Sequence, residues 1–288
     1  MKALTILTLN AGLLDIEILG HKVLESAPFE KERLAALPEA LIGTHADVIA
    51  LQEVYEQEHR MFLIKELHKV YPHHFYSRQH RLFRLDNSLI FFSKYPIVQK
   101  KALPYRDAII EERLLAYKGA LVAKIDIAGF GIVTFFNFHT VSGGLRDPQN
   151  ERVERVRAEQ IAQMIQQIER TKGHDFKIIL GDLNAGPEAA KENYDMFSQF
   201  QYVDAITLKH RSYQKKTWDP GNKLNSESHY KNCPPQRCDH VFIRERDLKH
   251  IRIDCADIIL DRPSVKTSSG EKVTVSDHAG VLVTLSRI

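Results

Sequence analysis

Short apolar runs, separated by turn residues, dominate the pattern of hydrophobic and polar positions along this chain. These runs are rich in Ile, Val, Leu and Phe and are too short for helices, so they predict buried β-strands. They span residues 4–9, 48–51, 88–93, 120–127, 131–138, 177–180, 240–243 and 280–285.

Three segments between these runs repeat apolar residues at helical spacing, at residues 30–45, 56–70 and 150–171. They predict amphipathic helices. The two runs at 120–127 and 131–138 are joined by Ala128 and Gly129, which predicts a tight hairpin and therefore a partly antiparallel sheet. Helices that cover hairpin-forming strands indicate an α/β fold with stacked sheets and helices outside.

Two polar segments, 209–235 and 260–274, are expected to be long loops. Long loops in compact domains are more often functional than idle, and each of these precedes a predicted strand. Because no segment has the composition of a linker, one domain over residues 1–288 is the simplest organisation.

The composition describes an ordinary globular protein. The 288 residues include 40 Lys and Arg against 37 Asp and Glu, a net charge of +3. This charge is too mild to indicate a nucleic-acid-binding protein, although a local basic patch is not excluded by it. The apolar run after Met1 is shorter than a signal peptide requires and ends at Asn10, so a strand is favoured.

Three cysteines, Cys233, Cys238 and Cys255, are too few for a disulfide framework. They are expected to be ordinary thiols in a reducing compartment, which favours the cytoplasm. No stretch is apolar and long enough to span a bilayer. A monomer that touches a membrane only peripherally, or that is exported without a cleaved signal, is compatible with these features.

Candidate chemistry lies at the ends of the predicted strands. The run 177–180 leads into Gly181, where the backbone can turn sharply so that Asp182 and Asn184 face one pocket. Near the end of the chain, Asp277 stands beside His278, whose imidazole ordinarily titrates near neutral pH. A carboxylate, a carboxamide and an imidazole at strand ends are the groups that hydrolysis of a phosphate ester needs.

Three further candidates have two interpretations each when taken singly. Glu53 follows a buried strand and either binds a cation or opens the next helix. His139, at a strand end, is either catalytic or a hydrogen-bonded structural residue. Asp239 is either functional or a turn carboxylate.

The ordered set of these residues is more specific than any member. Strand-end residues recur in chain order across nearly the whole sequence: Asn10, Glu53, His139, Asp182, Asn184, Asp239, Asp277 and His278. With the surrounding motifs, such as Leu-Gln-Glu-Val at 51–54 and Gly-Asp-Leu-Asn at 181–184, the chain resembles the endonuclease/exonuclease/phosphatase superfamily from end to end.

The resemblance implies a four-layered α/β sandwich of two mixed sheets flanked by helices, and a hydrolase dependent on Mg²⁺ or Mn²⁺. It implies that Glu53, assisted by Asn10, binds the metal and that Asp277 lies close to it. His278 corresponds to the imidazole that activates water or orients the phosphate, and Asp239 to the carboxylate that fixes its tautomer. Asp182 and Asn184 correspond to the pair that positions the nucleophile, while His139 and Asn184 contact the phosphate.

The substrate is less determined, because the superfamily includes nucleases, phosphoinositide phosphatases and neutral sphingomyelinases. Segments 87–97 and 118–122 look like neutral sphingomyelinases, which favours a phospholipid headgroup. The apolar segment 13–19 is either a membrane-touching loop or packed on the core. The chain departs from sphingomyelinases at Thr140, where a second His soon after His139 is usual, and at His240, where an aromatic residue or Arg is more usual.

Other functions stay open on the sequence alone. The basic and aromatic segment 73–84 could stack nucleic-acid bases, bind an anionic headgroup or be solvated surface. An AP-endonuclease or deoxyribonuclease and a phosphoinositide phosphatase are the alternative enzymes. A catalytically inactive binding module is disfavoured because every matched position is present.

Overall fold

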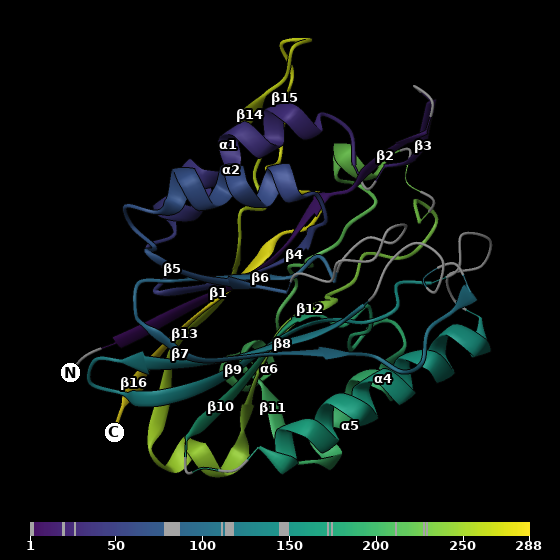
Figure 1. The fold of residues 1–288 in the computed structure, drawn as a ribbon. Helices are drawn as coiled ribbons and strands as arrows, with labels where there is room; N and C mark the ends of the chain where they lie inside the picture. Colours follow the sequence, from purple (N-terminus) through teal and green to yellow (C-terminus); the bar gives the residue numbers. More distant parts are fainter. Residues whose placement is uncertain are drawn as a thin grey trace.

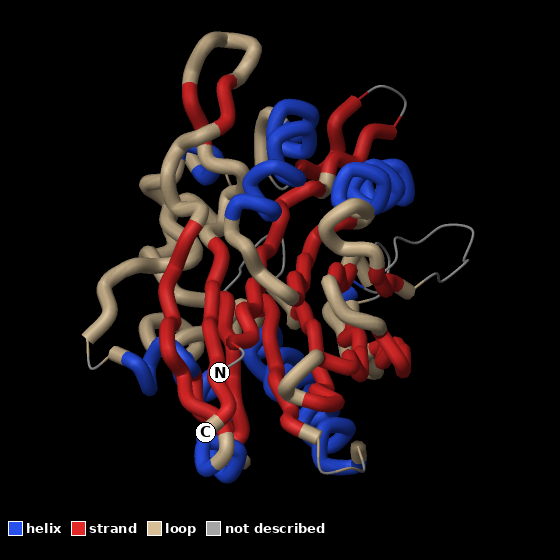
Figure 2. Tube along the Cα trace, turned by 90° about the vertical axis from the view of Figure 1, so that its left-hand side faces the viewer, coloured by secondary structure: helices blue, strands red, loops and turns tan. Residues whose placement is uncertain are grey.

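The computed structural model describes residues 3–18, 21–25, 27–77, 87–110, 112, 118–143, 150–171, 173, 175–210, 212–226, 228 and 230–288. Two six-stranded mixed sheets form its centre (Figures 1 and 2). The first has the strand order β13-β16-β1-β4-β6-β5, and the second has the order β11-β12-β10-β9-β8-β7.

The strands of the first sheet are β1 (Ala3–Leu13), β4 (Val48–Val54), β5 (His73–Tyr76), β6 (Ile90–Ser93), β13 (Ile251–Ile259) and β16 (Gly280–Arg287). Those of the second are β7 (Ile97–Pro104), β8 (Gly119–Ile127), β9 (Gly131–His139), β10 (Phe176–Asp182), β11 (Tyr202–Asp204) and β12 (Asp239–Arg244). Two small hairpins project from the body, β2 (Asp15–Ile18) with β3 (His21–Glu25) and β14 (Val265–Lys266) with β15 (Lys272–Val273) (Figure 1).

Helices cover the outer faces of both sheets (Figure 1). Helices α1 (Glu30–Gly43) and α2 (Gln57–Leu67) pack on the first sheet, while α4 (Glu151–Arg170) and α5 (Lys191–Gln199) pack on the second. The short elements are α6 (Ala205–Lys209) and the 3-10 helices η1 (Lys223–Asn225) and η2 (Glu245–Lys249). The order helix, sheet, sheet, helix is the four-layered α/β sandwich predicted from the sequence.

The space between the sheets is filled by apolar side chains from both. Leu4, Val48 and Phe91 of the first sheet belong to the same buried cluster as Phe135 and Val241 of the second. This contact explains why the strand sequences are apolar runs rather than strict alternations: each sheet is buried on both faces.

A polar bridge crosses this apolar layer. The Asn137 carboxamide on β9 accepts a hydrogen bond from Gln52 Nε2 on β4 at 2.7 Å and donates to the Leu51 carbonyl oxygen at 3.0 Å. Gln52 also contacts Thr8 of β1 at 3.1 Å. Because a buried amide must find partners, this network fixes how the two sheets sit on one another near the strand ends.

All eight predicted strands and all three predicted helices are present, with boundaries shifted by a few residues. The expected hairpin is confirmed by β8 and β9, where Ile127 pairs with Gly131. The segment 260–274 is less irregular than expected, since it carries the β14–β15 hairpin.

The prediction of a loop over residues 13–19 is wrong where it can be checked. Leu13 ends β1 with its side chain fully buried, and residues 15–18 form β2. Leu19 and the side chains of residues 15–18 lie outside the described part. In the segment 73–84, residues 73–76 form β5 and residues 78–84 lie outside the described part.

Candidate functional site

The second sheet brings three predicted site residues together at one end of its neighbouring strands β9, β10 and β12. In the register of the parallel pair β9 and β10, Asp182 lies opposite His139. In the antiparallel pair β10 and β12, the same Asp182 lies opposite Asp239. Gly181 makes this close packing possible, because a Cβ there would stand 2.0 Å from the Phe138 carbonyl oxygen and its φ is +145°.

The first sheet contributes Asn10 from β1. Its Nδ2 donates to Asp182 Oδ2 at 2.9 Å across the gap between the sheets, and its Oδ1 accepts from the Gly12 amide at 3.0 Å. The other oxygen of Asp182 accepts from the Asn184 amide at 2.8 Å, and Asn184 Nδ2 donates to the Thr140 carbonyl oxygen at 3.2 Å. Asn10, Asp182 and Asn184 therefore belong to one hydrogen-bonded group.

Glu53, near the end of β4, faces the same group. Its Oε1 lies 3.8 Å from His139 Nε2, which lies 3.6 Å from Asp182 Oδ2. Helix α2 begins only at Gln57, with Glu56 as its N-cap, so Glu53 does not open that helix. Its left-handed backbone, with φ of +56°, is a conformation that costs free energy in a residue other than glycine and is concentrated at functional sites.

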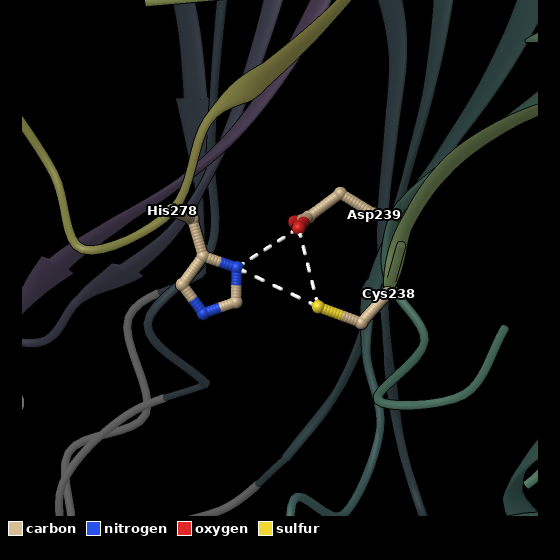
Figure 3. A group of neighbouring side chains, drawn as sticks. All are labelled: Cys238, Asp239 and His278. Carbon is tan, nitrogen blue, oxygen red and sulfur yellow. Dashed lines mark hydrogen bonds and ion pairs between the residues drawn. The ribbon is translucent and has the colours of Figure 1, made fainter. Parts of the chain in front are cut away.

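Asp239 and His278 form a buried pair across the two sheets (Figure 3). Asp239 Oδ2 lies 2.8 Å from His278 Nδ1, the contact expected from the sequence. Burial opposes the charged ring, but the Asp239 carboxylate outweighs that effect and raises the pKa of His278 well above its ordinary value. The His278 amide donates to Ser276 Oγ at 3.1 Å, which fixes the backbone before β16.

The Asp277 carboxylate lies close to the backbone of Gly12, two residues after Asn10. A Cβ on Gly12 would stand 2.0 Å from Asp277 Oδ1, so the carboxylate occupies the space that a larger residue at 12 would need. Ser276 Oγ links the two, because it donates to the Asn10 carbonyl oxygen at 2.6 Å and contacts Asp277 Oδ1 at 3.1 Å.

Lys118 and Glu112 are site residues that the sequence analysis did not include. Lys118 is buried, and its Nζ lies 3.1 Å from His139 Nε2, 2.7 Å from the Thr140 carbonyl oxygen and 3.2 Å from Glu112 Oε1. Burial and the Lys118 charge together lower the pKa of His139 well below its ordinary value. The His139 ring is therefore neutral, and the positive charge beside it resides on the lysine. The similarity of segment 118–122 to sphingomyelinases was the one signal for this residue.

Asp182 carries an electrostatic cost. Burial, followed by the nearby charge of Asp239, raises its pKa to about 6. Two carboxylates side by side in a buried setting repel one another unless a cation lies between or near them.

Cys238, predicted from the sequence to be an ordinary thiol, has two close polar neighbours. It is 3% exposed, and its Sγ lies 3.5 Å from Asp239 Oδ2 and 3.7 Å from His278 Nδ1 (Figure 3). Burial raises the pKa of the thiol, so Cys238 is protonated at neutral pH.

The donor set suits a hard divalent cation. The residues that could hold Mg²⁺ are Glu53, Asp277 and Asn10, whose side chains offer carboxylate and amide oxygens, the ligands that Mg²⁺ prefers. The partly exposed Glu53 side chain, 16% accessible, is the open end of this group.

Among the described residues, no helix combines the length and the apolar character needed to cross a membrane.

A match to the Endonuclease/Exonuclease/phosphatase family runs over residues 7–278, from the first strand to His278. The chain belongs to this family. The match encloses each predicted site residue, so the family resemblance inferred from the sequence is confirmed.

The individual proteins to which this chain is similar share 26% of its residues or fewer. The chain is 26% identical over 285 residues to a Drosophila melanogaster protein named "Putative neutral sphingomyelinase"; the match covers 97% of this chain and 61% of that protein. Sphingomyelinase C from Streptomyces griseocarneus superposes with a TM-score of 0.76 at 19% identity, covering 99% of both chains. TDP2 from D. rerio, in complex with a single-strand DNA product, has a TM-score of 0.72 at 18% identity, covering 99% of this chain and 100% of that one. These two structures share the fold.

Proposed function

We propose that this protein hydrolyses a phosphate ester by activating water with the help of Mg²⁺ or Mn²⁺. The observation that carries the proposal is the buried Asp239–His278 pair beside the Asn10–Asp182 hydrogen bond, each joining one sheet to the other. A water-activating imidazole and an oxygen-rich group that suits a cation thus lie at the same end of the sandwich.

Positive charge is the first requirement of the reaction, because a phosphate ester is anionic and repels a nucleophilic oxygen. Lys118 supplies a buried ammonium group, which holds His139 neutral and in place. Glu53, Asn10 and Asp277 would hold the cation, which when bound would neutralise the phosphoryl oxygens. His139 and Asn184 are the residues proposed to contact the phosphate.

A correctly oriented base is the second requirement. The Asp239 carboxylate accepts a hydrogen bond from Nδ1–H of His278, so Nε2 is the nitrogen proposed to face the reaction. Because Asp239 raises the pKa of this ring, Nε2 must first release its proton before it can act as the base. Asp182 and Asn184 are held to each other and to Asn10, so they are fit to position the attacking water.

We further propose that the substrate is a phospholipid headgroup, cleaved as a sphingomyelinase cleaves a phosphodiester. Three features support this choice: the name of the Drosophila relative, the fold shared with sphingomyelinase C, and the sphingomyelinase-like segments 87–97 and 118–122. The second segment starts at Lys118, which contacts His139. The fold shared with TDP2 supports a DNA-cleaving alternative.

The deciding experiment compares sphingomyelin and phosphoinositides in vesicles with abasic-site DNA and plasmid DNA, each in Mg²⁺ and in excess EDTA. The expected result is turnover of a lipid that rises on vesicles and stops in EDTA. Cleavage of DNA without turnover of any lipid would replace the lipid proposal with the nuclease. Full activity in EDTA would contradict the role of the cation.

A further inference from the structure

Three different metal-binding atoms meet at the junction of β12 with the chain before β16 (Figure 3). They are Cys238 Sγ, Asp239 Oδ2 and His278 Nδ1, and all three residues are buried. The separations are 3.5 Å from sulfur to oxygen, 3.7 Å from sulfur to nitrogen and 2.8 Å from nitrogen to oxygen.

We propose that Cys238, Asp239 and His278 form a second cation site, selective for a sulfur-preferring ion such as Zn²⁺, and that its occupation switches the enzyme off. The ion would bind the same Nδ1 and Oδ2 atoms that form the His–Asp pair. The inhibition rests on the proposed function, whereas the binding of the ion does not.

The geometry fits a tetrahedral ion closely. With Zn–S near 2.3 Å and Zn–N or Zn–O near 2.0–2.1 Å, the ligand atoms of a tetrahedral site stand about 3.3–3.6 Å apart. Both separations from Cys238 Sγ are already within about 0.2 Å of this range. Only the Asp239–His278 separation must open, by about half an ångström, and this is the contact that inhibition would break.

The surroundings of the three side chains favour such a site. Asp239 Oδ1 is buried and has no hydrogen-bond partner in the described part of the chain, so this carboxylate has unused binding capacity. Thr217 Oγ1 accepts the backbone amides of Cys238 and Asp239, at 3.0 and 3.1 Å, which holds both residues in place. The same hydroxyl lies 3.5 Å from Cys238 Sγ, where it can donate to a thiolate.

The donor types separate this site from the magnesium site. Thiolate and imidazole ligands select Zn²⁺ over Mg²⁺, whereas the oxygens of Glu53, Asn10 and Asp277 select Mg²⁺. Binding is a proton exchange without redox change: Cys238 releases its thiol proton, and the imidazolium of His278 releases the Nδ1 proton and keeps the one on Nε2. Two protons leave for each ion bound.

The test measures ion binding directly on the full chain, in excess Mg²⁺. Zn²⁺ affinity is determined by competition with a chromogenic chelator, and Cd²⁺ reports sulfur ligation through its thiolate absorption. We expect one tight Zn²⁺ per chain and a Cd²⁺–thiolate band. Cys238→Ser should lose the band and weaken Zn²⁺ binding by more than the roughly 10-fold that follows loss of a group that only hydrogen-bonds to a ligand, because it removes a ligand itself. His278→Ala, which removes a different ligand, should weaken Zn²⁺ binding similarly if Cys238→Ser fails to fold.

The exposed Cys255 provides the matched control, Cys255→Ser, since this residue lies on β13 and is not one of the three residues of the proposed site. This variant should keep both the band and the affinity. Tight Zn²⁺ binding that survives Cys238→Ser, or that excess Mg²⁺ displaces, would overturn the site. If the ion binds as expected but no phosphate ester is hydrolysed, the site stands and the proposed function fails. If turnover occurs and Zn²⁺ neither binds nor inhibits, the site fails alone.

Discussion

Asp239 and His240 are adjacent on β12, yet they belong to separate His–Asp pairs. Asp239 binds His278, whereas His240 Nδ1 contacts Asp204 Oδ2 at 2.6 Å and its Nε2 contacts the Ala185 carbonyl oxygen at 2.9 Å. Successive side chains of a strand point to opposite faces. One pair therefore lies between the sheets at the site, and the other packs with the helices on the outer side of the second sheet.

This arrangement gives the first prediction its own control. Asp239→Asn should lower kcat by roughly a thousandfold or more, because the carboxamide favours the wrong tautomer of His278. His278→Ala should cost still more. Asp204→Asn, which disturbs the second pair, should lower the melting temperature while kcat stays close to the unmodified value. Equal loss of kcat in both Asp→Asn variants would mean that the site pair acts only through stability.

The second prediction concerns the cation. Glu53→Gln removes a carboxylate ligand, so Mg²⁺ should bind more weakly in calorimetry and kcat should fall, with the circular dichroism spectrum unchanged. Glu56→Gln is the control, because Glu56 occupies the N-cap position of α2 without a side-chain capping bond and contacts His59 at 3.3 Å. Unaltered Mg²⁺ affinity in Glu53→Gln would remove Glu53 from the metal site.

The third prediction is that replacing Asp182 by Asn raises the free energy of unfolding at pH 8 but not at pH 4. The pKa of Asp182 is raised to about 6 from its ordinary 3.8, so the folded state resists ionisation. Well below pH 3.8 the Asp182 carboxyl is protonated in the folded and the unfolded chain, so it does not lower the free energy of unfolding. As the pH rises from 3.8 through 6, Asp182 ionises more readily in the unfolded chain than in the folded one. The free energy of unfolding therefore falls, by about 3 kcal/mol once the pH is above 6.

Asp182→Asn should remove this cost and lose about 1 kcal/mol from the hydrogen bond with Asn10. In EDTA the variant should thus be more stable than the unmodified protein at pH 8, and no more stable at pH 4, although it is catalytically impaired. Urea unfolding at the two pH values measures the difference. The same difference in free energy of unfolding between variant and unmodified protein at pH 4 and pH 8 would contradict the raised pKa of Asp182.

The fourth prediction concerns Lys118. Lys118→Met removes the buried charge, so the pKa of His139 should rise, although burial continues to hold it below its ordinary value. NMR titration of the ring measures this, and kcat should fall about 100-fold if the ammonium stabilises the transition state. Lys124→Met changes a lysine that lies on β8, the strand that follows Lys118, and that pairs with Asp175 at 2.7 Å, and this change should leave both quantities unchanged. An unshifted His139 titration in Lys118→Met would refute the coupling.

The fifth prediction tests the close contact between Gly12 and Asp277. Gly12→Ala places a methyl group where Asp277 Oδ1 lies and imposes a side chain on a backbone with φ of +56°, so both kcat and the melting temperature should fall. Gly43→Ala, in helix α1 where a Cβ meets no atom within 4 Å, should leave kcat unchanged and should not lower the melting temperature. A Gly12→Ala protein with full activity would show that Asp277 can move without consequence.

Two strands that the sequence did not predict, β7 and β13, carry exposed residues. β7 carries exposed lysines, Lys100 and Lys101, on the edge of its sheet, and β13 alternates buried positions with Arg252 and Asp254. Neither has the continuous apolar run that marks a strand buried on both faces, so the pattern gave no clear signal.

The sequence identified candidate site residues that lie close to a predicted strand end. It missed those whose contacts arise only from packing in the folded chain. Asp182 follows a predicted apolar run and His278 precedes another, each separated from it by one residue, and the fold brings these two strand ends together. Lys118 also begins a strand, but only the surrounding protein deprives its ammonium of water and aims it at His139. No spacing along the chain reports that Cys238 would touch both members of the His–Asp pair.

Because Asp239 belongs to one sheet and His278 leads into the other, their hydrogen bond exists only when the two sheets are docked. Neither half of the sandwich holds the complete pair that we propose as the base. During refolding, strands and helices can therefore be complete in circular dichroism while the protein is still inert. If the proposed function holds, the return of turnover then reports that the two sheets have docked.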